Sequence, residues 1–151
     1  MGKRLVTDFF RHDHDRLEQL FEEFCEARAT GSQPAGDCFR QLQRAMERHL
    51  DWEDRLMFPL YESRAGPAGQ LPIAAMRAEH EELHKLLATL QRLLAGPDSA
   101  VEPILPQLRC GMEMHHAREE AIVYGLIDDD LNDADRAQLF ARLDAWPAAG
   151  R

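Results

Sequence analysis

The chain has 151 residues, of which 44% are hydrophobic and 30% charged, and its formal net charge is −9. This length suits one domain with its own core, and no apolar run approaches the roughly 18–20 residues of a membrane span. The acidic balance, without a run of Lys and Arg, argues against a nucleic-acid-binding surface.

The start of the chain lacks the apolar core and the cleavage site of a signal peptide. The cysteines are Cys25, Cys38 and Cys110, an odd number without CxxC spacing, which argues against a disulfide framework and a cysteine-based zinc site. We expect all three to be small buried apolar residues. A cytoplasmic protein without membrane or nucleic-acid partners is therefore predicted, and the sequence points to no particular protein partner.

Apolar residues recur at helical spacing along most of the chain, with Gly and Pro in the breaks. They predict four long helices and a short fifth, over about residues 6–29, 37–63, 72–95, 101–127 and 133–145. Pro103 and Pro106 are expected in or near the first turn of the fourth helix, where proline is tolerated. Asn132 or Asp133 is expected to cap the fifth. The short connections predict an all-α, antiparallel up-down-up-down four-helix bundle at about 5–128, in a single domain of residues 1–151.

The two halves of the chain align without a gap when one is shifted by 66 residues. The polar residues that match are, in pairs, His14 and His80, His49 and His115, and Glu53 and Glu119. All six are of types that bind metal ions. The sequence therefore predicts a two-fold internal repeat of a helical hairpin.

Three pairs of polar residues have the i, i+4 spacing that places both side chains on one face of a helix. They are His49 and Glu53, His80 and His84, and His115 and Glu119. Each pair lies on the apolar stripe of its predicted helix and is expected to point into the core. An unpaired carboxylate is unfavourable there, and coordination of a cation removes that penalty.

The helix lengths place these side chains in one layer of the bundle. At about 1.5 Å per residue, His14 and His49 lie roughly 22 and 18 Å from the loop that joins their helices. The candidate ligands are His14, His49, Glu53, His80, His84, His115 and Glu119. Seven nitrogen and oxygen donors are too many for one ion and suit two, bridged by the carboxylates. We favour iron, although zinc, manganese and copper accept the same ligands.

At these residues the chain resembles the hemerythrins and the wider hemerythrin HHE cation-binding family. The motifs that carry the resemblance are Asp13-His14, His49-Leu-Asp-Trp-Glu53, His80-Glu-Glu-Leu-His84, His115-His-Ala-Arg-Glu119 and Met57-Phe58-Pro59. The resemblance extends over about residues 5–145.

The resemblance implies a non-haem di-iron protein that binds or senses dioxygen, or another diatomic such as nitric oxide, at an open iron position. It assigns one iron to His80, His84 and His115, and the other to His14 and His49. The bridges would be Glu53, Glu119 and an oxo or hydroxo group. A di-iron oxidase or peroxidase, or an iron-handling repair protein, is the alternative, and a zinc-binding structural or signalling domain is the third reading.

Four further residues remain open or lie outside this pattern. Hemerythrins proper carry an Asp five residues after the fourth-helix histidine, so Glu120 competes with Glu119 as the bridging residue. The repeat places Glu18 opposite His84, where it could bind the metal, donate a hydrogen bond to a ligand or turn to solvent. His12 and His116 fall outside the matched set and are expected at the surface.

A ferritin-like di-iron bundle is a competing interpretation, because two segments match its ExxH motif. They are Glu81–His84 and Glu113–His116. These segments fall on adjacent helices, whereas that fold carries the motif on its second and fourth helices. We therefore rank this interpretation lower.

Overall fold

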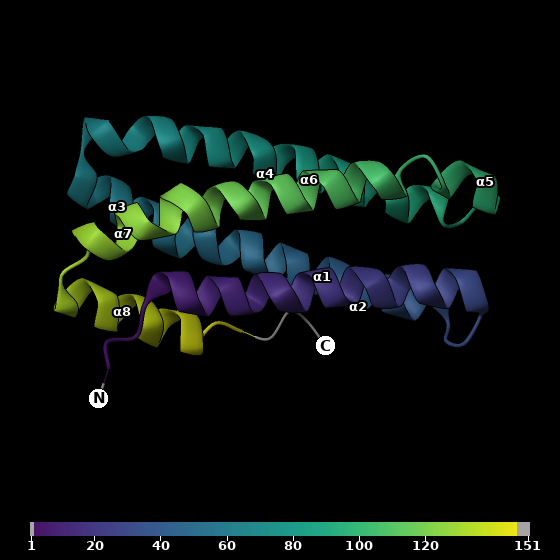
Figure 1. The fold of residues 1–151 in the computed structure, drawn as a ribbon, viewed down its shortest axis with the longest axis horizontal. Coiled ribbons are helices and arrows are strands. Elements are labelled where there is room, and N and C mark those ends of the chain that lie inside the picture. Colours follow the sequence, from purple (N-terminus) through teal and green to yellow (C-terminus); the bar gives the residue numbers. More distant parts are fainter. Residues whose placement is uncertain (1, 148–151) are drawn as a thin grey trace.

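The computed structural model describes residues 2–147, which form a bundle of helices (Figure 1). The longer helices α1, α2, α4 and α6 lie side by side along the long axis of the molecule. In chain order the elements are α1 (Val6–Thr30), α2 (Ala35–Trp52), η1 (Glu53–Met57), α3 (Phe58–Ala65), α4 (Pro67–Leu93), α5 (Asp98–Val101), α6 (Leu105–Arg118), η2 (Glu119–Val123), α7 (Tyr124–Asp130) and α8 (Asp133–Asp144). Residues 2–147 contain no strand, which confirms the prediction of an all-helical chain.

Two π-helical segments interrupt the helices that carry the HxxxE motifs. The second predicted helix is observed as α2, η1 and α3 in direct succession, and α6, η2 and α7 follow one another in the same way. The segments begin at Glu53 and at Glu119, whose carbonyl oxygens accept from the backbone N–H five residues later. Such single-turn bulges are frequent at functional sites, and nothing in the sequence pattern signalled them.

Prolines and one glycine move two helix boundaries from the predicted positions. Helix α4 begins at Pro67 and not at residue 72, because Gly66 turns the chain with a φ of 61° and a proline is favourable in the first turn. The predicted fourth helix begins at Leu105 as α6 and not at about residue 101, and Pro103 lies between it and the short α5. The predicted cap of α8 is confirmed, since the Asn132 side chain accepts from the Asp135 N–H.

Two hydrophobic clusters fill the bundle, one at each end. One contains Phe10, Met57 and Tyr124 with residues of α8, and the other contains Leu17 and Leu87 with residues of α2 and α6. His14 lies between Phe10 and Leu17 in α1, so the predicted polar layer separates two apolar regions. Among the described helices, none combines the length and the hydropathy needed to span a bilayer.

The cysteines differ in exposure more than the sequence suggested. Cys38 is buried as expected, Cys25 is half-buried and Cys110 is exposed. The prediction is wrong for Cys110, which lies on the outer face of α6 between the buried Leu108 and Met112.

Candidate metal centre

Six of the seven predicted ligands meet in the layer between the two hydrophobic clusters. Four long helices each supply one histidine, and each π-helical segment supplies its first residue. The six residues are His14, His49, Glu53, His80, His115 and Glu119, and each is at most 1% exposed. Glu119 and not Glu120 occupies the core position, as the repeat register favoured.

The two glutamates lie at the centre of this layer, with histidine nitrogens on both sides. On one side, His80 Nε2 lies 3.2 Å from Glu53 Oε2, and His115 Nε2 lies 3.1 Å from Glu119 Oε1. On the other side, His14 Nε2 lies 3.1 Å from Glu119 Oε2. His49 Nε2 lies 3.5 Å from Glu53 Oε2. Two groups of four possible ligands result, and both glutamates belong to each group.

Several donor atoms of this layer have no hydrogen-bond partner. Such atoms indicate whether a cation would fit between the side chains. Among the described residues, His49 Nε2, Glu53 Oε2 and Glu119 Oε1 are buried and have no hydrogen-bond partner. A buried polar atom left in this state costs about 1–3 kcal/mol, and more when it is charged. Cations between the glutamates and the histidines would give these atoms partners, so the residues fit a two-metal centre.

Each of the four histidines is held on its outer side by a carboxylate. The Nδ1 atoms lie 2.8 Å from Glu120 for His14, 2.9 Å from Asp13 for His49, 2.9 Å from Asp54 for His80 and 2.7 Å from Glu79 for His115. An ionised carboxylate only accepts, so Nδ1 carries a proton and Nε2 is the nitrogen that faces the layer. This carboxylate–histidine arrangement is typical of metal-ligating histidines.

The outer position of these carboxylates was not predicted, although the sequence contains a signal for it. Asp13 and Glu79 are separated by the same 66 residues as the histidines, and so are Asp54 and Glu120. Applying the repeat to every acidic residue, and not only to the core stripe, would have identified both pairs.

The charges of this layer shift several pKa values. Burial on its own lowers the pKa of His80, but the hydrogen bond to Asp54 and the nearby carboxylates of Glu119 and Glu53 outweigh it and raise this pKa to about 11. Burial raises the pKa of Glu119, yet the charge and close imidazole of His115, followed by the imidazole of His14, bring it well below its ordinary value. Without metal, protons therefore hold the layer together, and a cation must displace them.

Tyr124 is a member of the layer that the sequence analysis missed. Its hydroxyl lies 2.6 Å from Glu53 Oε1, 2.8 Å from Glu119 Oε2 and 3.0 Å from His14 Nε2, and the side chain is fully buried. Burial, followed by the charges of Glu119 and Glu53, raises the pKa of Tyr124 well above 10, so the phenol keeps its proton in the metal-free layer. The repeat gave no signal, because the matching residue is Phe58.

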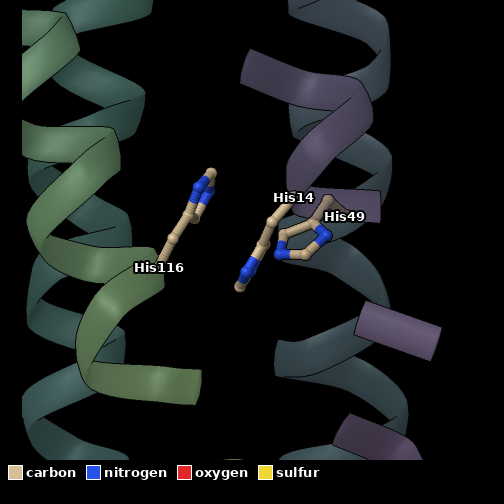
Figure 2. A group of neighbouring side chains, drawn as sticks. All are labelled: His14, His49 and His116. Atoms are coloured by element: carbon tan, nitrogen blue, oxygen red, sulfur yellow. The ribbon is translucent and has the colours of Figure 1, made fainter. Parts of the chain in front are cut away.

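His116 lies inside the bundle, so its predicted surface position is wrong. The side chain is 2% exposed and its ring stacks on that of His14, with centroids 3.7 Å apart (Figure 2). Its Nδ1 lies 3.2 Å from Glu18 Oε1, and with His14 and His49 it forms a third group of possible ligands. Burial, followed by the charges of His14 and His49, lowers the pKa of His116 to about 2, so the ring is neutral. The sequence did contain a signal for this burial, because His116 lies four residues after Met112 on the apolar face of the predicted fourth helix.

The structure does not bring His84 to the layer. Its side chain is exposed, while Leu83 and Leu87 face the core and fix the orientation of this part of α4. Glu18 is 48% exposed at its side chain and contacts His116. His12 is exposed, as expected.

The competing ferritin-like motif has no site in this structure. Three of its four members, Glu81, His84 and Glu113, are exposed and only His116 is buried, so they cannot reach a common ion inside the bundle. The HxxxE pairs occupy the interior, and the match of the other two segments to the ExxH motif is therefore coincidental.

A comparison with protein families agrees with the geometry. The model of the hemerythrin HHE cation binding domain matches residues 5–103, a segment that includes His14, His49, Glu53 and His80. Neither curated proteins nor solved structures gave a match. The matched segment is 99 of the 151 residues, so the chain belongs to the hemerythrin HHE cation-binding domain family.

Proposed function

We propose that this chain is a non-haem di-iron protein that binds or senses dioxygen or another small diatomic such as nitric oxide. One observation carries the proposal: two buried groups of four ligands share both Glu53 and Glu119, and each adds two histidines of its own. Shared carboxylates suit a pair of ions, because one oxygen of each can serve each ion. Imidazole and carboxylate donors accept iron, zinc or manganese, and we favour iron.

The proposed ligand set differs from that implied by the resemblance. The ligands are His14 and His49 for one ion, His80 and His115 for the other, and both glutamates for each. His84 is left out, so each ion has four protein donors and not an unequal two-histidine and three-histidine division. First-row metals in such sites commonly take up to six ligands, which leaves room for an oxo or hydroxo bridge and a small exogenous ligand.

The protein's own residues provide positioning, charge and exclusion of water. Asp13, Asp54, Glu79 and Glu120 orient the four imidazoles, and the two hydrophobic clusters separate the layer from solvent. Tyr124 holds a proton on its hydroxyl beside both glutamates. A bound iron pair would supply the reversible electron transfer that a diatomic ligand requires.

A di-iron redox enzyme, such as an oxidase or peroxidase, or an iron-handling repair protein, is the second candidate. The observation that favours it is the polar wall beside His14, where the Tyr124 hydroxyl and the His116–Glu18 pair lie. An oxygen carrier would favour an apolar wall, whereas a positioned phenol and imidazole serve proton transfer. Turnover assays with hydrogen peroxide and with nitric oxide separate the two, because a carrier shows none.

The proposal includes the architecture behind the site. An up-down-up-down four-helix bundle built from two copies of a helical hairpin, all within one domain, accounts for the repeated positions. Its support is that η1 and η2 begin 66 residues apart, as do the matched histidines and outer carboxylates. A duplicated hairpin would also explain why the two ligand groups share their central glutamates.

The decisive experiment is metal analysis of protein purified without added metal, combined with its absorption spectrum. The proposal predicts about two irons per chain and charge-transfer bands from an oxo or hydroxo bridge at the ultraviolet edge. Zinc in place of iron, with no such band, would support a structural or signalling domain, and a metal-free chain would overturn the proposal.

A further inference from the structure

The two ligand groups differ in what occupies the space beside them. Phe58 stacks on His80 with ring centroids 5.6 Å apart and an interplanar angle of 21°. Tyr124, the repeat-matched residue, has its ring 5.6 Å from that of His14. The two halves of the layer therefore place an aromatic ring alike, and the Tyr124 hydroxyl and the buried His116 distinguish the His14 side from the other.

The Tyr124 hydroxyl contacts two of the four carboxylate oxygens of the layer and leaves the other two without such a contact. Glu53 Oε1 and Glu119 Oε2 lie within hydrogen-bond distance of the Tyr124 hydroxyl. Among the described residues, Glu53 Oε2 and Glu119 Oε1 have no hydrogen-bond partner. These two oxygens lie 3.2 Å from His80 Nε2 and 3.1 Å from His115 Nε2 respectively. Glu119 Oε1 thus faces the His80–His115 side, whereas Glu53 Oε2 lies between the two sides, because it is also 3.5 Å from His49 Nε2.

We infer that the two metal positions are unequal, and that the Tyr124 hydroxyl makes the position beside His14 and His49 the weaker one. The inference rests on the proposed two-metal centre. A cation beside His80 and His115 meets carboxylate oxygens that the phenol does not contact. A cation beside His14 competes with a phenol for one oxygen of each glutamate and for His14 Nε2.

The two positions differ in the number of contacts that a cation must replace. Contacts between histidine Nε2 atoms and carboxylate oxygens occur on both sides, and the His80–His115 side adds one contact between its two Nε2 atoms, 3.1 Å apart. On the other side the phenol lies within 3.0 Å of three acceptors, two of them carboxylate oxygens, and its one proton serves one of them at a time. Because hydrogen bonds to charged groups are the stronger ones, we expect a difference of at least about tenfold in dissociation rate between the ions.

The test is a chelator challenge of the loaded full-length chain. The protein is saturated with Zn²⁺, excess chromophoric chelator is added, and metal release is followed by absorbance. Wild type should release its zinc in two phases of equal amplitude. In Tyr124→Phe the fast phase should slow by about tenfold or more, toward the rate of the slow phase.

Three further variants assign the phases and act as matched controls. Phe58→Tyr installs a hydroxyl beside His80, so it should accelerate the slow phase. His14→Ala should remove the fast phase, and His80→Ala should remove the slow one. A folded Tyr124→Phe protein keeps the test valid even where Phe58→Tyr does not fold.

The outcomes separate this inference from the proposed function. A chain that takes up no metal overturns both. Two equivalents of zinc released in a single phase, or a fast phase that does not slow in Tyr124→Phe, overturns the inequality and leaves the two-metal centre intact.

Discussion

His80 and His115 approach each other with their Nε2 atoms 3.1 Å apart, in a layer from which solvent is excluded. Two imidazoles at this distance share one proton at best, and two buried glutamates lie beside them. Such a layer weakens the core unless a cation links its members. The stability of the protein should therefore depend on metal.

We expect the loaded protein to unfold at a higher temperature than the chelator-stripped protein. Free metal at about a thousand times its Kd adds about 4 kcal/mol for each site, or about 8 kcal/mol for two, and for a chain of this size each kcal/mol moves Tm by about 2–4 °C. Thermal circular dichroism should therefore show a difference of about 16–32 °C. Equal transitions with and without metal would show that the layer is stable on its own.

The stripped protein should lose stability as the pH rises. The folded-state pKa of His80 is about 11, above its ordinary value of 6.5. The protonated form therefore stabilises the fold fully below about pH 6.5, and this stabilisation is lost as the pH rises through about 11. Urea unfolding of the stripped chain over this range should show the decline, and His80→Gln should flatten it. Parallel curves for wild type and variant would refute the assignment to His80.

The outer carboxylates should set metal affinity without contacting the metal. We expect Asp54→Asn and Glu120→Gln each to weaken metal binding by about 10–100-fold, because the imidazole loses its orienting partner. Competition against a chelator of known affinity measures this. The control is Glu82→Gln, an exposed acidic residue of α4 that pairs with Lys85. Equal affinity in all three variants would contradict the role of the outer carboxylates.

His84 and His80 should behave differently, although the HxxxH motif treats them as equals. Because the His84 side chain is exposed, His84→Ala should keep the wild-type metal content. His80→Ala should lose about half of it or more, since it removes a ligand of one ion. Metal analysis of both purified variants measures this, and loss of metal in His84→Ala would restore the ligand set implied by the resemblance.

His116 should be replaceable by leucine, the residue found at the matching position 50. The ring has one buried nitrogen without a hydrogen-bond partner among the described residues, and its other nitrogen contacts the half-exposed Glu18. An apolar side chain of similar volume removes the unsatisfied atom, so we expect His116→Leu to change the free energy of unfolding by less than about 2 kcal/mol, with unchanged metal content. A fall in metal content would instead identify His116 as a ligand.

The sequence was sufficient for the parts of the site that follow ideal helical geometry. The i, i+4 spacing and the repeat together located His49, Glu53, His115 and Glu119 in the core, and favoured Glu119 over Glu120. His80 followed from the repeat and from its spacing to His84, and His14 followed from the repeat alone. These residues lie on faces whose apolar neighbours fix the direction of the side chain.

The missed residue Tyr124 depends on a local departure from the α-helix. In an ideal helix, five residues advance the face by about 140° beyond a full turn, so Tyr124 would point away from Glu119. The π-helical segment at Glu119–Val123 has wider turns and brings the phenol to the same face. His84 was misjudged for a different reason: its spacing from His80 was correct, but Leu83 and Leu87 determine which face of α4 is buried.

The most direct test of the two-metal centre is anomalous diffraction at the iron edge, from crystals of the protein purified without added metal. We predict two peaks inside the bundle, one beside His80 and His115 and the other beside His14 and His49, each within ligand distance of Glu53 and Glu119. A single peak, a peak at His84, or no peak inside the bundle would contradict this account.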